Sequence, residues 1–169
     1  ATAAVLKDGW FYSGDVGYLD KRGHLFITDR KKDLFKLSNG KYVAPQLIES
    51  LLKQSEFVSQ VVVVGTGRKQ PVALIVPEWE SLRAALAEAG EEDAPKDRVE
   101  LSKYPPAVKI VQRDIANLTA QLVDYERIRR IALLQNEFTI DGGELTPTLK
   151  VKRKVIDERY GDLIEKLYT

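Results

Sequence analysis

The sequence contains no cysteine, no methionine and only one histidine, His24. Without cysteine the chain forms no disulfide bond, binds no metal through thiolates and has no cysteine nucleophile. A single histidine excludes a histidine-rich metal site, and we expect its ring to face solvent on a strand. The sequence therefore predicts no metal-binding residues.

Long apolar runs and a strong net charge are also absent. No segment approaches the roughly 18 apolar residues of a membrane span, and no secretory signal peptide opens the chain. The formal net charge is +1, which argues against a nucleic-acid-binding arm and against strong attraction to a membrane surface. We expect a cytoplasmic protein with no nucleic-acid partner and no transmembrane segment, at most peripheral to the inner face of a membrane.

The sequence does contain enough apolar material for a core, since 44% of its 169 residues are apolar and 30% are charged. This length corresponds to one average domain, or to one domain with an appendage. The chain opens on an Ala/Thr-rich stretch without an initiator methionine. We expect it to be part of a longer protein.

The front of the chain alternates short β-type segments with glycine turns, a pattern typical of hairpins. One hairpin is expected around the turn at residues 20–23, and a second around Asn39-Gly40. The expected strands cover residues 11–13, 16–19, 24–28, 34–37 and 41–43.

Core strands and amphipathic helices follow these hairpins. Apolar residues at helical spacing give the helix that begins at Pro45 one buried face, formed by Leu47, Ile48, Leu51 and Leu52. Further helices are expected at 79–89, 106–125 and 155–167, and strands at 58–64, 72–76, 131–134 and 138–140. The pattern predicts an α+β fold: a small mixed sheet flanked by helices, with a β-hairpin appendage at its front.

Two segments carry residues that bind phosphate groups in other proteins. Residues 65–69, G-T-G-R-K, look like a phosphate cradle, but a strand follows where a phosphate loop would lead into a helix. A hairpin loop is therefore the better interpretation. Residues 150–154, K-V-K-R-K, place four cations at a helix start, where they oppose the helix dipole. A solvated helix start is the ordinary interpretation of such a charge run, and a nearby phosphate or carboxylate that relieves the conflict is the functional alternative.

Asp15 lies between Gly14 and Val16 and presents a carboxylate in a tight turn. Local hydrogen bonds within the turn explain such a residue. The functional alternative is a grip on the two hydroxyls of a diol, such as a nucleotide ribose.

Three motifs in order resemble the C-terminal end of the adenylate-forming (AMP-binding) superfamily, which includes acyl-CoA synthetases, peptide-synthetase adenylation domains and luciferases. Residues 9–15, G-W-F-Y-S-G-D, resemble its ribose-binding motif. Residues 29–49 begin with D-R-K-K-D and resemble its hinge motif. Residues 145–150, L-T-P-T-L-K, resemble its final motif.

The resemblance implies a role for each matching position. Lys150 would be the catalytic lysine, and Lys32 would be the hinge on which a mobile domain turns. The implied nucleotide-binding residues are Asp15 and Arg30, and the loop implied to line the pantetheine tunnel of CoA is Ser38, Asn39 and Gly40. Residues 1–31 would then be a β-hairpin segment from the end of the large adenylating domain, and residues 32–169 the mobile C-terminal lid domain.

Sequence variants within these motifs point to the long-chain fatty acid–CoA ligases. The strings K-L-S-N-G-K-Y-V-A-P and L-T-P-T-L-K-V-K-R resemble that branch most. In more usual members Ser/Thr-Gly precedes the lysine, whereas Thr148-Leu149 stands here. The implied reaction activates a long-chain fatty acid with ATP to an acyl-AMP and transfers the acyl group to CoA.

The resemblance also implies a division of labour with an upstream domain. The phosphate loop, the glutamate that binds Mg²⁺ and the acyl pocket of the family would all precede Ala1. We therefore expect this chain alone to be inactive and to bind ATP weakly.

Two alternatives remain open. One is a fatty acid–AMP ligase or a carrier-protein-loading adenylation domain, which differs in the acceptor of the acyl group. The other is a stand-alone, non-catalytic binding module that keeps the fold and tolerates loss of Lys150.

Overall fold

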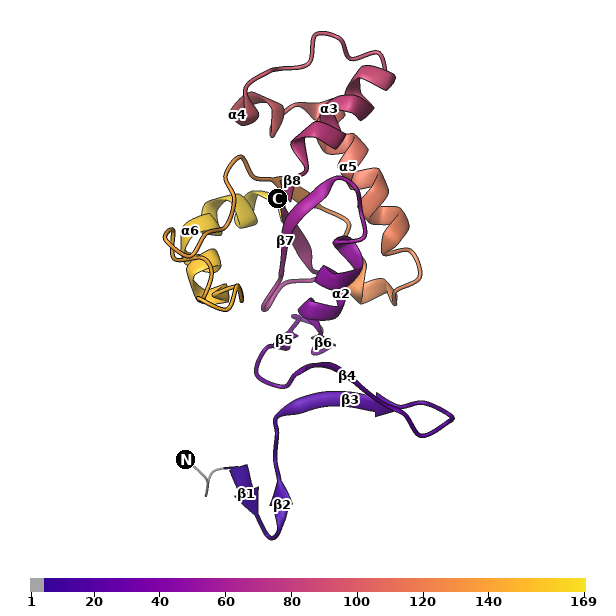
Figure 1. Ribbon diagram of the computed structural model, residues 1–169, viewed down its shortest axis with the longest axis vertical. Helices are drawn as coiled ribbons and strands as arrows, with labels where there is room; N and C mark the ends of the chain where they lie inside the picture. Colours follow the sequence, from indigo (N-terminus) through magenta and orange to yellow (C-terminus); the bar gives the residue numbers. More distant parts are fainter. Residues whose placement is uncertain (1–4) are drawn as a thin grey trace.

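The computed structural model describes residues 5–169, apart from the side chain of Asp29. Small β-hairpins at the N-terminal end extend away from a central sheet that is flanked by helices (Figure 1). This arrangement confirms the predicted α+β class with a β appendage at its front. Among the described residues, no helix is long and apolar enough to cross a membrane.

Three antiparallel hairpins form the first part of the chain. The strands are β1 (Leu6–Lys7) with β2 (Trp10–Phe11), β3 (Asp15–Leu19) with β4 (Leu25–Arg30), and β5 (Phe35–Lys36) with β6 (Tyr42–Val43). The β3–β4 and β5–β6 pairs confirm the two predicted hairpins, whereas β1 was not predicted. Gly17 lies at an irregularity of β3, where a Cβ atom would collide with the Phe26 carbonyl oxygen, so only glycine fits.

The central sheet has three strands in the order β7 (Val58–Val64), β8 (Val72–Pro77) and β9 (Ile131–Leu133). Strands β7 and β8 pair antiparallel, so the Gly-rich segment 65–69 is a hairpin loop, as its sequence favoured. Strand β9 runs parallel to β8. Strand β7 therefore forms one edge of this sheet.

Five helices surround the sheet. They are α2 (Pro45–Leu52), α3 (Trp79–Glu88), α4 (Arg98–Leu101), α5 (Pro105–Leu118) and α6 (Arg153–Lys166), with a 3-10 turn at Asp124–Glu126. Figure 1 shows α6 on one face of the sheet and α2 and α5 on the other. Helix α4 was not among the helices predicted from the sequence.

The sheet separates two apolar clusters, as the alternation of side chains along a strand requires. Val61 and Val63 of β7 join the cluster beneath α2, α3 and α5. Val62 and Val64 join the cluster beneath α6. All four valines are buried, because both faces of the sheet are covered.

The longest predicted helix was placed too far along the chain. Helix α5 ends at Leu118 with Thr119 as its C-cap, because the helical hydrogen-bond pattern stops there: the Ala120 N–H donates to the Asn117 carbonyl oxygen, three residues back instead of four, at 3.2 Å. The Thr119 hydroxyl donates to the Ile115 carbonyl oxygen at 2.8 Å. Leu122 and Tyr125 still pack against the core from the loop that follows. Because their spacing in the sequence is that of a helix, the pattern predicted that the helix continues to Tyr125.

Two smaller predictions were also wrong. Residues 138–140 form no strand, because the Gln60 side chain binds both backbone groups of Phe138, which a neighbouring strand would otherwise pair. Leu47 is 48% exposed instead of buried. The interior place on helix α2 belongs to Glu49, which is only 8% exposed.

Candidate functional site

Lys150 lies in a closed hairpin between the central sheet and helix α6. Leu145 and Val151 pair across its base. The Thr146 N–H donates to the Lys150 carbonyl oxygen at 2.8 Å, and the Lys150 N–H donates to Thr146 Oγ1 at 3.0 Å. The backbone of Lys150 is thus fixed, while its side chain is exposed to solvent.

Leu149 completes this hairpin in a conformation that favours glycine. Its φ angle is +59°, in the left-handed region. Its N–H donates to the Thr146 carbonyl oxygen at 2.8 Å, which closes the turn. The leucine side chain is 69% exposed and therefore gains little from packing. This finding explains in physical terms why more usual motifs carry glycine before the lysine.

A hollow of about 540 Å³ lies beside the hairpin, and cationic side chains from distant parts of the sequence line it. The cationic residues that line it are Arg30, Lys32, Lys53, Lys150 and Arg153, and the acidic ones are Asp33 and Glu49. The excess of positive charge suits an anion with several negative charges, such as a polyphosphate. Residues from the hinge motif and from the final motif therefore line one site.

Asp15 is connected to this hollow by its contact with Arg30. Its Oδ1 lies 3.2 Å from Arg30 Nε, across the β3–β4 hairpin. A second hollow, of about 510 Å³, lies between Ser13, Gly14 and residues 30–32. Arg30 and Lys32 therefore border both hollows.

Lys32 lies in the turn that connects β4 to β5. The Asp33 and Leu34 N–H groups both donate to the Arg30 carbonyl oxygen, at 2.8 and 3.2 Å. The Asp33 side chain accepts a hydrogen bond from Gln46 of helix α2 at 3.0 Å. The connector between the hairpins and the helix-flanked sheet is thus a compact, hydrogen-bonded turn.

Ser38, Asn39 and Gly40 form the turn of the β5–β6 hairpin and line neither hollow. Gly40 has a φ angle of +84° and donates to the Leu37 carbonyl oxygen at 3.0 Å. The Asn39 side chain accepts from the Lys41 N–H, also at 3.0 Å. All three turn residues are exposed.

A partly buried ion pair that sequence reasoning missed lines the cationic hollow. Arg153 donates to Glu49 Oε1 and to the Val63 carbonyl oxygen, each at 2.8 Å. The Val63 N–H donates to the same Glu49 oxygen at 2.9 Å. Burial raises the pKa of Glu49 above its ordinary value, and the Arg153 charge and the Val63 N–H offset this rise only in part. Glu49 supplies a carboxylate near the helix start, as the cation–dipole conflict in the sequence indicated.

A second buried acid fixes the chain on the other side of the Lys150 hairpin. Glu144 is 3% exposed and pairs with Arg159 of helix α6, which also binds the Gly142 carbonyl oxygen. Burial alone would raise the pKa of Glu144. Hydrogen bonds from backbone N–H groups and the Arg159 charge outweigh burial and lower it.

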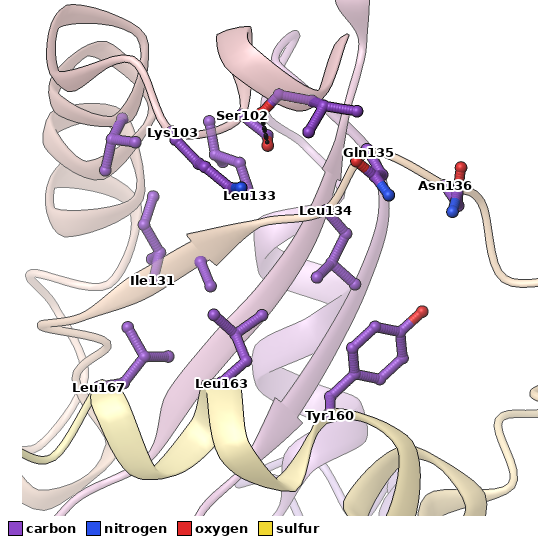
Figure 2. Close-up of a pocket in the computed structure, with 13 residues that line it drawn as sticks. Ser102, Lys103, Ile131, Leu133, Leu134, Gln135, Asn136, Tyr160, Leu163 and Leu167 are labelled. Atoms are coloured by element: carbon purple, nitrogen blue, oxygen red, sulfur yellow. Dashed lines mark hydrogen bonds between the residues drawn. The ribbon is translucent and has the colours of Figure 1, made fainter.

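A separate apolar groove of about 480 Å³ lies between α4, α5, β9 and α6 (Figure 2). Ile131, Leu163 and Leu167 line it, with Ser102 and Lys103 among its polar residues. It contains none of the residues that the motifs singled out. The candidate chemistry therefore belongs to the cationic hollow.

The described residues also show where the single histidine lies. His24 faces solvent, with 66% of its side chain exposed and its Nδ1 3.0 Å from Asp20 Oδ2. No group of three or more His, Cys, Asp or Glu side chains within residues 5–169 could hold a metal ion.

Curated relatives match nearly the whole chain. The long-chain-fatty-acid–CoA ligase FadD15 of Mycobacterium tuberculosis is 40% identical over 99% of this chain and 28% of its own length. Long-chain-fatty-acid–CoA ligase 1 of Homo sapiens is 36% identical over 98% of this chain and 24% of its own length. The chain thus spans about a quarter of the length of these relatives, and their identity confirms the resemblance to this branch.

Solved structures show the same fold. The adenylation domain of a carboxylate reductase from Mycobacterium chelonae superposes with a TM-score of 0.77 and 28% identity, over 99% of this chain and 24% of that one. The adenylation and carrier-protein didomain of a carboxylic acid reductase from Segniliparus rugosus, in complex with AMP, gives a TM-score of 0.76 and 28% identity, over 99% and 22%. A family model described as the AMP-binding enzyme C-terminal domain matches residues 32–169. The chain belongs to the family of AMP-binding enzyme C-terminal domains.

Proposed function

We propose that this chain supplies the C-terminal part of an enzyme that activates a long-chain fatty acid with ATP and transfers the acyl group to CoA. One observation carries the proposal: Lys150 and Arg30, from two motifs far apart in the sequence, line the same cationic hollow. The names of the curated relatives support the substrate class. The extent of the family match supports a lid domain that begins at Lys32, with residues 1–31 belonging to the adenylating part.

The proposed role of Lys150 follows from the charge of the first half-reaction. Acyl-adenylate formation joins two anions, a carboxylate and the α-phosphate of ATP, and negative charge builds on the phosphoryl oxygens. A lysine on a hairpin that is already closed stabilises that charge with little reorganisation. Asp15 and Arg30 are proposed to hold the ribose in the same complex.

The second half-reaction is proposed to use the other face of the domain. After a rotation at Lys32, the Gly40 turn would replace Lys150 at the reacting atoms and contact the pantetheine arm. The separation of the Gly40 turn from the Lys150 hollow supports this assignment. Such gating by a hinge lets one domain serve two chemical steps.

Magnesium is implied by the resemblance, but no cluster of acidic or imidazole side chains in residues 5–169 fits it. The proposal therefore leaves the metal to the adenylating domain. The residues of this chain supply positive charge and position through lysine and arginine instead.

The decisive experiment changes Lys150 to Ala in the full-length polypeptide that contains this chain and measures the half-reactions separately. We expect palmitate-dependent ATP–pyrophosphate exchange to fall about 10²- to 10³-fold. Thioester formation from supplied palmitoyl-adenylate and CoA should persist. Lys154→Ala is the matched control, because this cation of the same basic run is 90% exposed and pairs with Glu158. Unchanged exchange in Lys150→Ala would reject the proposal and favour a non-catalytic binding module.

A carrier-bound thiol is the second candidate acceptor. The likeness to the Segniliparus rugosus didomain, which contains a carrier protein, favours it. Supplying palmitoyl-adenylate with either free CoA or a phosphopantetheinylated carrier protein distinguishes the two. A product formed only with the carrier would replace CoA in the proposal.

A further inference from the structure

Arg153 connects the chain segment that follows the Lys150 hairpin to helix α2 and strand β7. It follows Lys150 by three positions and is the first residue of helix α6. A cation at a helix N-terminus is unfavourable unless an anion compensates it. Here Glu49 compensates it, and helix α6 has no acidic residue in its first turn.

Three hydrogen bonds link Arg153, Glu49 and the backbone of Val63. Its two terminal nitrogens reach Glu49 Oε1 and the Val63 carbonyl oxygen, and the Val63 N–H reaches the same Glu49 oxygen. Val63 lies on β7, at the edge of the sheet, where its backbone groups have no neighbouring strand on the outer side. Glu49 and Arg153 therefore form the hydrogen bonds with the Val63 backbone that a neighbouring strand would otherwise form.

The same set connects the two parts of the cationic hollow. Glu49 is the last residue of the hinge motif and belongs to helix α2, and Arg153 follows the hairpin that carries Lys150. The side chains of Glu49 and Arg153 are only 11% and 26% exposed, so solvent screens their interaction weakly. The planar guanidinium fixes two directions at once, which a lysine ammonium does not.

We propose that Arg153 is a positioning residue, which with Glu49 sets the place of Lys150 relative to the hinge-side wall of the site. This inference rests on the proposed function, because it assigns Lys150 to acyl-adenylate formation. It predicts a selective defect: loss of Arg153 slows acyl-adenylate formation, which needs Lys150, and spares thioester formation, which does not. A merely structural role would weaken both steps together.

The test uses Arg153→Lys and Arg153→Met in the full-length polypeptide, with both half-reactions measured as for Lys150. We expect the kcat of palmitate-dependent exchange to fall about 10- to 100-fold in Arg153→Met, and less in Arg153→Lys, because small displacements of a reacting group have effects of this size. Thioester formation from palmitoyl-adenylate should stay within about twofold. Adding Glu49→Gln to Arg153→Met should reduce exchange little further, since the two residues act as one unit.

Arg68→Met is the matched control. Arg68 also ties helix α6 to the sheet, through Glu165 and the ring of Tyr168, but it does not line the Lys150 hollow. It should lower stability without the selective loss of exchange. Equal loss of both half-reactions in the Arg153 variants, or the same selective loss in Arg68→Met, would overturn the inference.

Hydrogen exchange gives a readout that does not depend on activity. In Arg153→Met, the hydrogen-bonded amides of Thr146, Leu149 and Lys150 should exchange about tenfold faster than in the parent, while amides of β8 stay protected. Unchanged exchange of these hairpin amides would overturn the inference. The proposed function fails separately, through Lys150→Ala, so the two failures are distinguishable.

Discussion

The Asp15 carboxylate and the Arg30 guanidinium face each other across the β3–β4 hairpin, where the two residues are cross-strand partners with Oδ1 and Nε 3.2 Å apart. Each residue comes from a different motif, so the hairpin is what brings the two motifs together. An arginine beside a carboxylate fixes its orientation. The Asp15 carboxylate is therefore positioned to accept hydrogen bonds from a diol.

Asp15→Asn tests this relationship. In the full-length polypeptide we expect the dissociation constant for ATP to rise about 10- to 100-fold, because hydrogen bonds to a charged acceptor contribute about 1.5 to 3 kcal/mol. Calorimetry measures it, with Asp20→Asn in the same hairpin as the control. Equal affinity in both variants would contradict the ribose assignment. For the chain alone we expect binding weaker than tens of micromolar.

Leu149→Gly should stabilise the chain relative to Leu149→Ala. Both changes remove an exposed side chain, but only glycine relieves the left-handed backbone at φ +59°. The expected difference in the free energy of unfolding is about 1 kcal/mol. Urea unfolding of the two variants measures it. A more stable alanine variant would show that the hairpin changes conformation when leucine is removed.

Gly40→Ala should impair thioester formation and spare palmitate-dependent exchange, the reverse of Lys150→Ala. A Cβ at this turn widens the backbone that is proposed to contact the pantetheine arm. Gly23→Ala is the control for backbone strain, because both glycines have a φ of +84° and sit in hairpin turns. If the two variants behave alike in both half-reactions, the assignment of the Gly40 turn is wrong.

Glu144→Gln should remove a pH-dependent contribution to stability. The folded chain lowers the pKa of Glu144 below its ordinary value of 4.5. The ionised group therefore stabilises the fold above that value, and this contribution disappears as the pH falls through the lower, folded pKa. We expect Glu144→Gln to cost about 2 kcal/mol at pH 7. Urea unfolding should show a smaller difference from the parent at pH 4, and a cost independent of pH would refute this explanation.

Local patterns predicted the elements whose own residues determine them. The valines of β7, the Asn39-Gly40 turn and Pro45 at a helix start each give a signal within a few positions. The end of α5 was predicted wrongly, because Leu122 and Tyr125 lie at helical spacing in the sequence although the helix ends before Thr119. Residues 138–140 were mistaken for a strand because their partner is the Gln60 side chain, distant in sequence.

The candidate site likewise contains residues that could be identified from the sequence and residues that could not. The resemblance to the family motifs singled out Arg30, Lys32 and Lys150, and the structure places them around one hollow. The acid that faces Arg153 was not identifiable, because Glu49 lies about a hundred positions earlier and only the packing of α2 and α6 against the sheet brings them together. Charge conflict at the start of α6 predicted that an anion lies there, without naming it.

The two tryptophans of the chain report on different parts of it. Trp10 in β2 is 74% exposed, whereas Trp79 at the start of α3 is 7% exposed. An ionic quencher in solution will therefore reach Trp10 in the native chain, while the emission of Trp79 will move to longer wavelength only when the sheet and its helices unfold. A protein surface that docks on the β1–β2 hairpin will shield Trp10 and leave the signal of Trp79 unchanged. Docking and unfolding can thus be followed as separate optical signals in one unlabelled molecule.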